Sequence, residues 1–336
     1  MRKRMEGDTV SKGKLKILLL FVSFLILSLL LYFSDVWKVV SIISSANPYY
    51  LLLAFSLSLL LMFVRTFRWN VLLRKLDIKI HFLKLFPVYM SGMFASNLTP
   101  GKIGEPVKSY LLKKTEGISI SRTLPSVVME RVFDVFSVII ISLVGLGIVK
   151  LPANVTPVLF AIVLFYLTAI VLMFYISAKK GRIYYVSEKL FRFFRWLPMV
   201  GRLERFLEGF AEKFNRSIVK YKDAGISVKN FILSLFVWGA EGVILYLSFL
   251  SVGIPVNPLL AASFISISVL VGVISFLPGG LGSSEAVMVL LFTYVYSLPI
   301  HSATAAVLIY RFLGFWLNVF VGFACLNLLK FKIKSA

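Results

Sequence analysis

The sequence predicts an all-α polytopic membrane protein, an inverted repeat with about six full transmembrane helices and two broken re-entrant hairpins. Hydrophobic residues make up 59% of the 336 residues and charged residues only 15%, below the roughly 25% of a soluble domain. Several apolar runs approach or exceed the roughly 18 to 20 residues that cross the hydrocarbon core. Basic residues lie between these runs, as they do in cytoplasmic loops.

The net charge of the chain is +22, and the positions of the basic residues indicate what they bind. Basic residues flank the apolar runs, and no RNA- or DNA-binding motif accompanies them. We therefore expect contacts with anionic lipid and no nucleic acid partner. Cys325 is the only cysteine, which excludes an internal disulfide and a thiolate metal cluster. We expect no bound metal and no cofactor.

Six apolar runs are candidate full spans, and the charge between them predicts their orientation. The first run follows a basic tail without a small-residue cleavage site, which indicates an uncleaved span. Basic residues in both tails and in segments 68–79, 102–122 and 178–228 place these parts inside the cell. This predicts a multi-pass protein of the cell (plasma or inner) membrane with both termini cytoplasmic. The six runs are about 16–34, 49–66, 124–149, 155–177, 229–251 and 303–329.

Two further apolar segments, 82–99 and 258–297, are interrupted by proline and glycine. Because basic residues precede and follow segment 82–116, we expect it to enter from the inside and return there as a re-entrant hairpin. When the alternation of inside and outside is followed along the chain, segment 258–297 becomes a hairpin that enters from the outside and returns there. Irregular backbone at membrane depth survives only where it packs within protein or lines a wet cavity. We therefore expect both hairpins to line a polar cavity.

The one long polar connection, 178–228, carries twelve basic and five acidic residues. Its apolar residues recur at helical spacing, which indicates a basic amphipathic linker on the cytoplasmic membrane surface. A solvated positive loop that only sets the topology is at least as good an interpretation.

The two hairpins carry one motif, P-G-x-[IL]-G, at residues 100–104 and again, 178 residues later, at 278–282. Each motif follows an apolar helix that bears a charge and precedes an apolar helix that bears an arginine. We interpret 1–336 as a single membrane domain with one repeat at about 49–149 and an inverted one at about 229–329. Transporters use such repeats to expose a central site to each side in turn. The charged residues are Arg65 and Glu241 before the motifs, and Arg131 and Arg311 after them.

Charged side chains at membrane depth indicate a functional site, because placing one there costs at least about 2.5–3.5 kcal/mol. Helix starts at the hairpin tips would attract an anion such as phosphate. The alternative is a set of structural ion pairs, such as Glu130 or Asp134 with Arg311. Whether Lys102 and Glu105 line the cavity or lie at the inner interface stays open. We assign no catalytic residue, and the predicted substrate-binding and translocation residues are Asn97, Pro100, Gly101, Gly104, Glu105, Glu130, Arg131, Asp134, Glu241, Pro278, Gly279, Gly280, Gly282, Glu285 and Arg311.

In order and spacing, these motifs resemble the lysylphosphatidylglycerol synthase transmembrane region, a flippase-like (UPF0104-like) integral membrane family. The resemblance covers nearly the whole chain and implies lipid translocation. In bacterial multiple peptide resistance factor, a similar region is implicated in moving aminoacylated phosphatidylglycerol between leaflets, and a separate soluble domain makes the lipid. The chain ends at Ala336, soon after its last predicted span, so we expect no synthase domain. The resembling residues are Asn97 to Gly101, Gly104, Glu105, Glu130, Arg131, Asp134, Leu277 to Gly282, Glu285, Arg311 and Trp316.

The leading hypothesis is a lipid flippase that moves a phosphate-bearing lipid, either a phospholipid or a polyprenyl-phosphate-linked one, between leaflets. Its partners would be that membrane lipid and a lipid-synthesising enzyme. We expect the phosphate between the hairpin tips, near Arg131 and Arg311. No G-x-x-x-x-G-K-[ST] motif is present, which argues against direct use of ATP. The oligomeric state stays open, with a homodimer as one alternative.

Two other function classes stay open. An integral-membrane enzyme, or an accessory subunit, of lipid headgroup modification would need Glu130 and Asp134 as an acid and base pair, because the five aspartates form no D-x-D motif. A small ion or solute transporter could use the same repeat.

Overall fold

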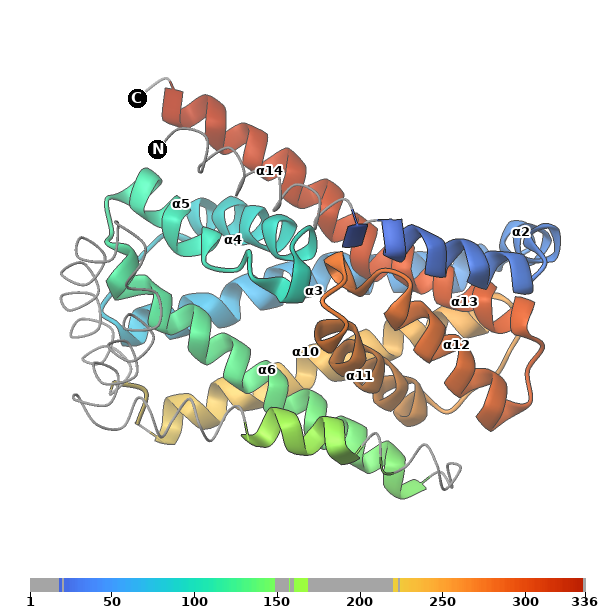
Figure 1. The fold of residues 1–336 in the computed structure, drawn as a ribbon. Coiled ribbons are helices and arrows are strands. Elements are labelled where there is room, and N and C mark those ends of the chain that lie inside the picture. Colours follow the sequence, from blue (N-terminus) through green and yellow to red (C-terminus); the bar gives the residue numbers. More distant parts are fainter. Residues whose placement is uncertain are drawn as a thin grey trace, which may run out of the picture.

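The computed structural model describes residues 18–19, 21–148, 157, 160–168, 220–222 and 224–334, and every regular element within them is a helix (Figure 1). This confirms the all-helical fold class. Four described helices are long and apolar enough to cross a membrane, and a bent pair, Phe21–Phe33 with Val36–Ser44, would make a fifth. The count of six stays a prediction, because most of 155–177 lies outside the described residues. So does nearly all of the linker 178–228.

In the first half of the chain, two crossing helices flank one hairpin (Figure 1). The crossing helices are α3 (Pro48–Lys75) and α6 (Ile120–Ile148). Between them, α4 (Phe82–Asn97) runs to the middle of the molecule, the short helix η1 (Pro100–Lys102) turns the chain, and α5 (Val107–Glu116) returns. The Pro-Gly motif therefore forms the tip of a re-entrant hairpin, which we call hairpin 1.

The second half of the chain repeats this order. Helix α10 crosses, α11 and α12 form hairpin 2 around the tip η3, and a last crossing follows. That last crossing is one long helix with a π-helical turn at η4. The elements are α10 (Ala224–Ser251), α11 (Pro258–Ile274), η3 (Pro278–Gly280), α12 (Ser283–Tyr296), α13 (Ile300–Arg311), η4 (Phe312–Trp316) and α14 (Leu317–Lys334).

The two hairpins open toward opposite ends of the molecule (Figure 1). At the mouth of hairpin 1, Lys84 and Glu116 form an ion pair of 3.7 Å. The last turn of α5 adds Lys113 and Lys114 there, so we call it the basic end. The mouth of hairpin 2, where the Asn257 N–H donates to the Tyr296 hydroxyl at 2.7 Å, lies at the other end, the neutral end. The expected inverted arrangement of the hairpins is therefore present.

The hairpin tips meet in the middle of the molecule, and glycine permits the contact. Gly101 and Gly279 both have φ near +60°, which glycine adopts readily because it has no Cβ. A Cβ on Gly279 would lie 2.5 Å from the Phe315 ring and 2.9 Å from the Asn97 carbonyl oxygen. The side chain of Phe276 lies 3.3 Å from the corresponding Cβ position of Gly101. The two tips thus form one contact surface.

The first helix of each hairpin packs against a crossing helix of the other half. Helix α11 lies on α6, and α4 lies on α14. Small residues bring the backbones close, as is common between membrane helices. Ser263 of α11 packs against Gly145 and donates to the Ile141 carbonyl at 2.8 Å, and Gly322 of α14 packs against the Met90 carbonyl.

Two element boundaries differ from the sequence prediction. Helix α3 does not end near residue 66 but continues to Lys75, so Arg68 is a buried helical residue and not part of an inner loop. Its charge lowers the local hydropathy, but carboxylates on neighbouring helices neutralise it. After the first span, expected at 16–34, the chain bends by 82° into a further helix, α2 (Val36–Ser44), which the six apolar runs do not include.

Candidate functional site

A central cluster of ionisable side chains lies where the two hairpin tips meet the crossing helices. It contains six cations and five carboxylates, and all are buried except Arg131 and Lys102, which are partly exposed. Charges at this depth require partners or a polar cavity. The members of the cluster are Arg65, Arg68, Lys102, Lys108, Arg131, Arg311, Glu105, Glu130, Asp134, Glu241 and Glu285.

In each half, the arginine that follows the hairpin binds a carboxylate of that hairpin. The Arg131 Nε lies 3.2 Å from Glu105 Oε2, and the Arg311 Nε lies 2.6 Å from Glu285 Oε1. Both pairs span 26 residues of sequence, so the inverted repeat extends to individual contacts. We call them latch 1 (Glu105–Arg131) and latch 2 (Glu285–Arg311).

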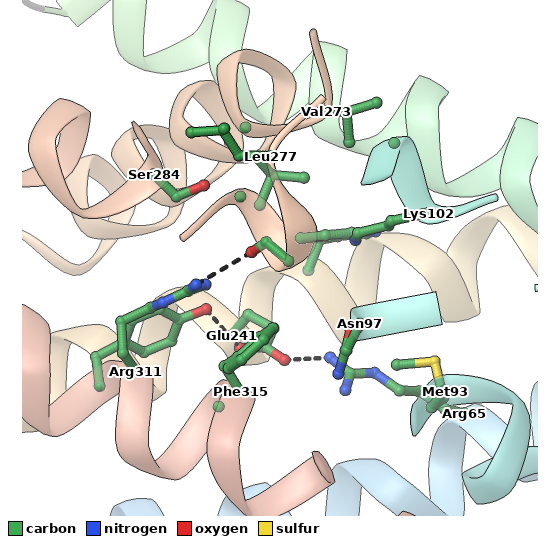
Figure 2. Close-up of a pocket in the computed structure, with 18 residues that line it drawn as sticks. Arg65, Met93, Asn97, Lys102, Glu241, Val273, Leu277, Ser284, Arg311 and Phe315 are labelled. Carbon is green, nitrogen blue, oxygen red and sulfur yellow. Dashed lines mark hydrogen bonds and ion pairs between the residues drawn. The ribbon is translucent and has the colours of Figure 1, made fainter. Parts of the chain in front are cut away.

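Latch 2 also anchors the tip of hairpin 2. Arg311 donates to the Gly279 carbonyl at 3.1 Å, as Figure 2 shows. Glu285 accepts from the Gly282 N–H at 2.8 Å, so the start of α12 already has a carboxylate as its cap. Both arginines that were expected to hold phosphate are thus neutralised by protein carboxylates in this conformation.

Arg68 is the centre of a second group of contacts, and the described residues of the other half contain no counterpart of it. Its guanidinium binds Glu130 at 2.9 Å and Asp134 at 3.1 Å and donates to Ser234 at 2.6 Å. Lys108 lies 2.5 Å from the other Glu130 oxygen. The structural ion pairs that we considered as an alternative to a functional site therefore exist. However, the cations that bind Glu130 and Asp134 are Arg68 and Lys108 and not Arg311.

Arg68 is the residue that sequence reasoning missed. The hydropathy of the sequence ends the predicted span before Arg68, because charged residues lower it, and so places Arg68 in an inner loop. Its spacing from Arg65 carries a usable signal, since residues three apart share one face of a helix. Two basic residues on one face of a continuing apolar helix indicate a partner inside the bundle.

Glu241 joins the two crossing helices α3 and α10. It accepts a hydrogen bond from Arg65 of α3 and, at 3.0 Å, from the Tyr310 hydroxyl of α13 (Figure 2). These two residues, Arg65 and Glu241, precede their hairpin motifs by similar distances in the two halves. The contact between them closes one side of the space between the tips.

Lys102 differs from the other cations of the cluster. Within the described residues, each of the other five is within 4.0 Å of a carboxylate and Lys102 is not. Its ammonium lies 5.9 Å from the centre of the Trp238 ring, a weak cation–π contact. Its backbone has φ +58°, which is uncommon for a residue with a Cβ. The cluster therefore carries one net positive charge. The residue that supplies this charge, Lys102, lies at the tip of hairpin 1.

Lys102 borders a cavity, a groove and a smaller space of about 50 Å³ beside Arg68 and Glu130. The cavity, of about 90 Å³, lies between the hairpin tips (Figure 2). The groove, of about 500 Å³, lies beside hairpin 1, α6 and α11 and is lined mainly by aliphatic side chains. Charged groups border the groove only where it reaches the tip, at Lys102 and latch 1 and at Asp134.

The structure brings most of the predicted site residues to these spaces. Asn97, Gly101, Glu241, Gly279, Gly280 and Arg311 line the cavity. Glu105, Arg131 and Asp134 line the groove, and Glu130 lies behind them in the contacts of Arg68. Lys102 and Glu105 thus both line the central spaces.

Five predicted site residues shape the tips without lining either space. A Cβ at Gly104 would overlap the Ala95 carbonyl, and the Gly104 N–H donates to Thr99 Oγ1 at 2.8 Å. Glu285 acts through Arg311. Within the described residues, no group of three or more His, Cys, Asp and Glu side chains is placed to hold a metal ion. The five residues are Pro100, Gly104, Pro278, Gly282 and Glu285.

Comparison with known proteins supports the resemblance seen in the motifs. Residues 17–322 match the family described as the lysylphosphatidylglycerol synthase TM region. A UPF0104 membrane protein of Methanothermobacter thermautotrophicus is 29% identical over 84% of this chain and 86% of its own length. A UPF0104 membrane protein of Methanocaldococcus jannaschii is 28% identical over 95% of this chain and 96% of its own length. One of Pyrococcus horikoshii is 27% identical over 91% of this chain and 95% of its own length. These names state no activity.

Proposed function

Because the chain belongs to the lysylphosphatidylglycerol synthase transmembrane-region family, we propose that it moves a phosphate-bearing lipid between the leaflets of the cell membrane. One observation carries this proposal. The single cation of the central cluster without a carboxylate partner, Lys102, lies where an apolar groove reaches a polar cavity. That combination fits a molecule with an anionic head and an apolar tail.

The charge balance favours an anion. A buried or half-buried ammonium without a partner is unfavourable, and a phosphate would supply the missing negative charge with charge-assisted hydrogen bonds. The other cations of the cluster already bind carboxylates, so they would position the site and not compete for the headgroup. Lys102 would make the first contact with the phosphate.

The groove favours a lipid over a free anion. Apart from Arg131 and Asp134, its walls along α6 and α11 are aliphatic. The aliphatic lining residues are Leu124, Val127, Val128, Val132, Val135, Val138, Val269, Leu270 and Val273. Such walls suit an acyl or prenyl chain that stays in the hydrocarbon while the head enters the cavity. The groove lies in the half toward the basic end, which positive charge predicts to be cytoplasmic.

The latches would let the two halves open in turn. Inverted repeats allow a central site to face either side, and here each hairpin has its own ion pair to a crossing helix. Latch 1 borders the open groove, and its Arg131 side chain is 32% exposed, whereas that of Arg311 in latch 2 is 10% exposed. We interpret this conformation as open laterally at hairpin 1 and closed at hairpin 2.

Reconstitution tests the proposal directly. Liposomes containing the protein and phosphatidylglycerol with a fluorescent NBD label would report flipping as the fraction of label that dithionite reaches. Removing the Lys102 charge with Lys102→Gln should slow flipping at least tenfold, because a hydrogen bond to a charged group contributes about 1.5–3 kcal/mol. Lys102→Arg should retain most of the rate.

Lys113→Gln is the matched control, because Lys113 is exposed on α5 outside both spaces. Equal flipping by the Lys102→Gln and Lys113→Gln variants would contradict the site assignment. No flipping above protein-free liposomes with this or a polyprenyl-phosphate probe would contradict the function itself.

The other function classes have less support from the geometry. Glu130 and Asp134, the acid and base pair required by the enzyme alternative, both accept hydrogen bonds from Arg68. A small-anion transporter would need the cavity but not the groove. Uptake of radiolabelled inorganic phosphate into the same liposomes, without lipid flipping, would favour that alternative.

A further inference from the structure

The groove at hairpin 1 has a counterpart position in the other half of the molecule. The motif glycines Gly104 and Gly282 are 178 residues apart, and the latch arginines are 180 residues apart. The groove is lined at Ile103, Glu105 and Leu124. By the same offsets, the corresponding position in the second half lies around Gly282 and Thr304.

The helix Phe21–Phe33 covers this counterpart position. A Cβ on Gly282 would lie 2.9 Å from the Ile26 Cβ and 3.0 Å from the Ser23 carbonyl oxygen, so the helix packs directly on the tip of hairpin 2. Ser34, which follows the helix, shares a buried hydrogen bond of 2.8 Å with Thr304. In Figure 1 this dark blue helix runs beside α12 and α13, from the hairpin tip toward the neutral end.

The two faces of the helix suit a cover. One face is buried at Ser23 and packs Leu30 against the core, while Phe24 and Leu29 are exposed as a lipid-facing surface would be. It precedes both repeats in the chain.

The attachment of the helix differs from that of the hairpins. Among the described contacts, no ion pair joins residues 21–33 to the rest of the molecule, whereas each hairpin has its own latch. The chain bends by 82° after this helix, and Asp35 at the bend has φ +57°. Hinges are commonly a few residues at the end of an element that absorb such backbone changes.

We propose that the groove at hairpin 1 has a second, equivalent lateral portal at hairpin 2 and α13, and that helix Phe21–Phe33 is its movable cover. The portal takes the apolar chain of the translocated phosphate-bearing lipid in the leaflet at the neutral end. Helix Phe21–Phe33 moves away from hairpin 2 and α13, which separates Ser34 from Thr304, to admit or release that chain. This inference rests on the proposed function.

A reversible cross-link tests the cover. In a background where Cys325 is replaced by serine, Ser34→Cys with Thr304→Cys places two thiols where the hydroxyls lie 2.8 Å apart. Oxidation should lower the flipping of NBD-phosphatidylglycerol at least tenfold, and dithiothreitol should restore it. Unchanged flipping after complete oxidation would overturn the inference.

A matched control lies in the same region. Ser275 and Ser283 have hydroxyls 2.9 Å apart, but both belong to hairpin 2, so a Ser275→Cys with Ser283→Cys cross-link leaves the cover free. This oxidised variant should flip lipid at the rate of its reduced form. Equal loss of flipping in both cross-linked variants would show a general effect of rigidity and would also overturn the inference.

A second readout does not depend on flipping. A single Thr304→Cys variant in the cysteine-free background should react with a membrane-permeant maleimide only when the cover moves, since Thr304 is fully buried. Adding phosphatidylglycerol to the micelles should raise the labelling rate at least severalfold. No labelling in any lipid would overturn the cover, whereas labelling without any flipping would count only against the proposed function.

Discussion

Arg68 offers the sharpest test of the central cluster, because two buried carboxylates depend on it. Its side chain is 2% exposed and binds both Glu130 and Asp134. In an Arg68→Met variant, Glu130 keeps its contacts with Lys108 and the Tyr89 hydroxyl. Asp134 keeps a hydrogen bond of 3.1 Å from Trp238 and loses its ion pair.

The expected loss follows from the uncompensated charge. Removing one partner of a buried ion pair lowers the free energy of unfolding by about 3–5 kcal/mol. Adding Asp134→Asn to Arg68→Met should restore part of that loss, because it removes the carboxylate that no longer has a cation. The two substitutions together should therefore cost less than Arg68→Met alone.

The measurement is unfolding of the purified protein in mixed micelles with increasing dodecyl sulfate, followed by tryptophan fluorescence. Arg74→Met is the control, because Arg74 lies on the same helix and is exposed, so its replacement should change stability by about 0.5 kcal/mol or less. A loss below about 1 kcal/mol for Arg68→Met, or strict additivity of Arg68→Met and Asp134→Asn, would refute this account of the cluster.

Two further predictions concern the tips and the latches. Gly279→Ala should destabilise the protein strongly or prevent folding, because the new Cβ would combine φ +61° with a contact of 2.5 Å to Phe315. As a control, the Cβ of Gly239→Ala in α10 meets no atom within 4 Å, so this variant should be neutral or stabilised by up to about 1 kcal/mol. Equal melting temperatures of the two variants would contradict the contact between the tips. Arg311→Met should lower the free energy of unfolding by more than Arg131→Met does. The Arg311 side chain is 10% exposed and the Arg131 side chain 32%, and solvent screens the more exposed ion pair. A larger loss for Arg131→Met in the same micelle titration would show that latch 2 is not the more buried pair.

The sequence alone predicts the membrane class, the positions of both hairpins and their inverted relation. These features are readable because each depends on local composition. Apolar runs of sufficient length cross hydrocarbon, and the Pro-Gly motifs at residues 100–104 and 278–282 interrupt a helix wherever they occur. The offset between the motifs then indicates the repeat without any knowledge of contacts.

Only the tertiary structure decides which charges neutralise one another. Arg68 binds carboxylates 62 and 66 residues away in sequence, and Arg65 binds Glu241, 176 residues away. Hydropathy counts each of these as a charge in an apolar run and carries no information about its partner. For the same reason, composition does not distinguish Lys102, which ends without a carboxylate, from Lys108, which binds Glu130. The position of helix Phe21–Phe33 over the second half is likewise set by packing, because an apolar run reads the same whether it crosses the membrane or covers a neighbouring helix.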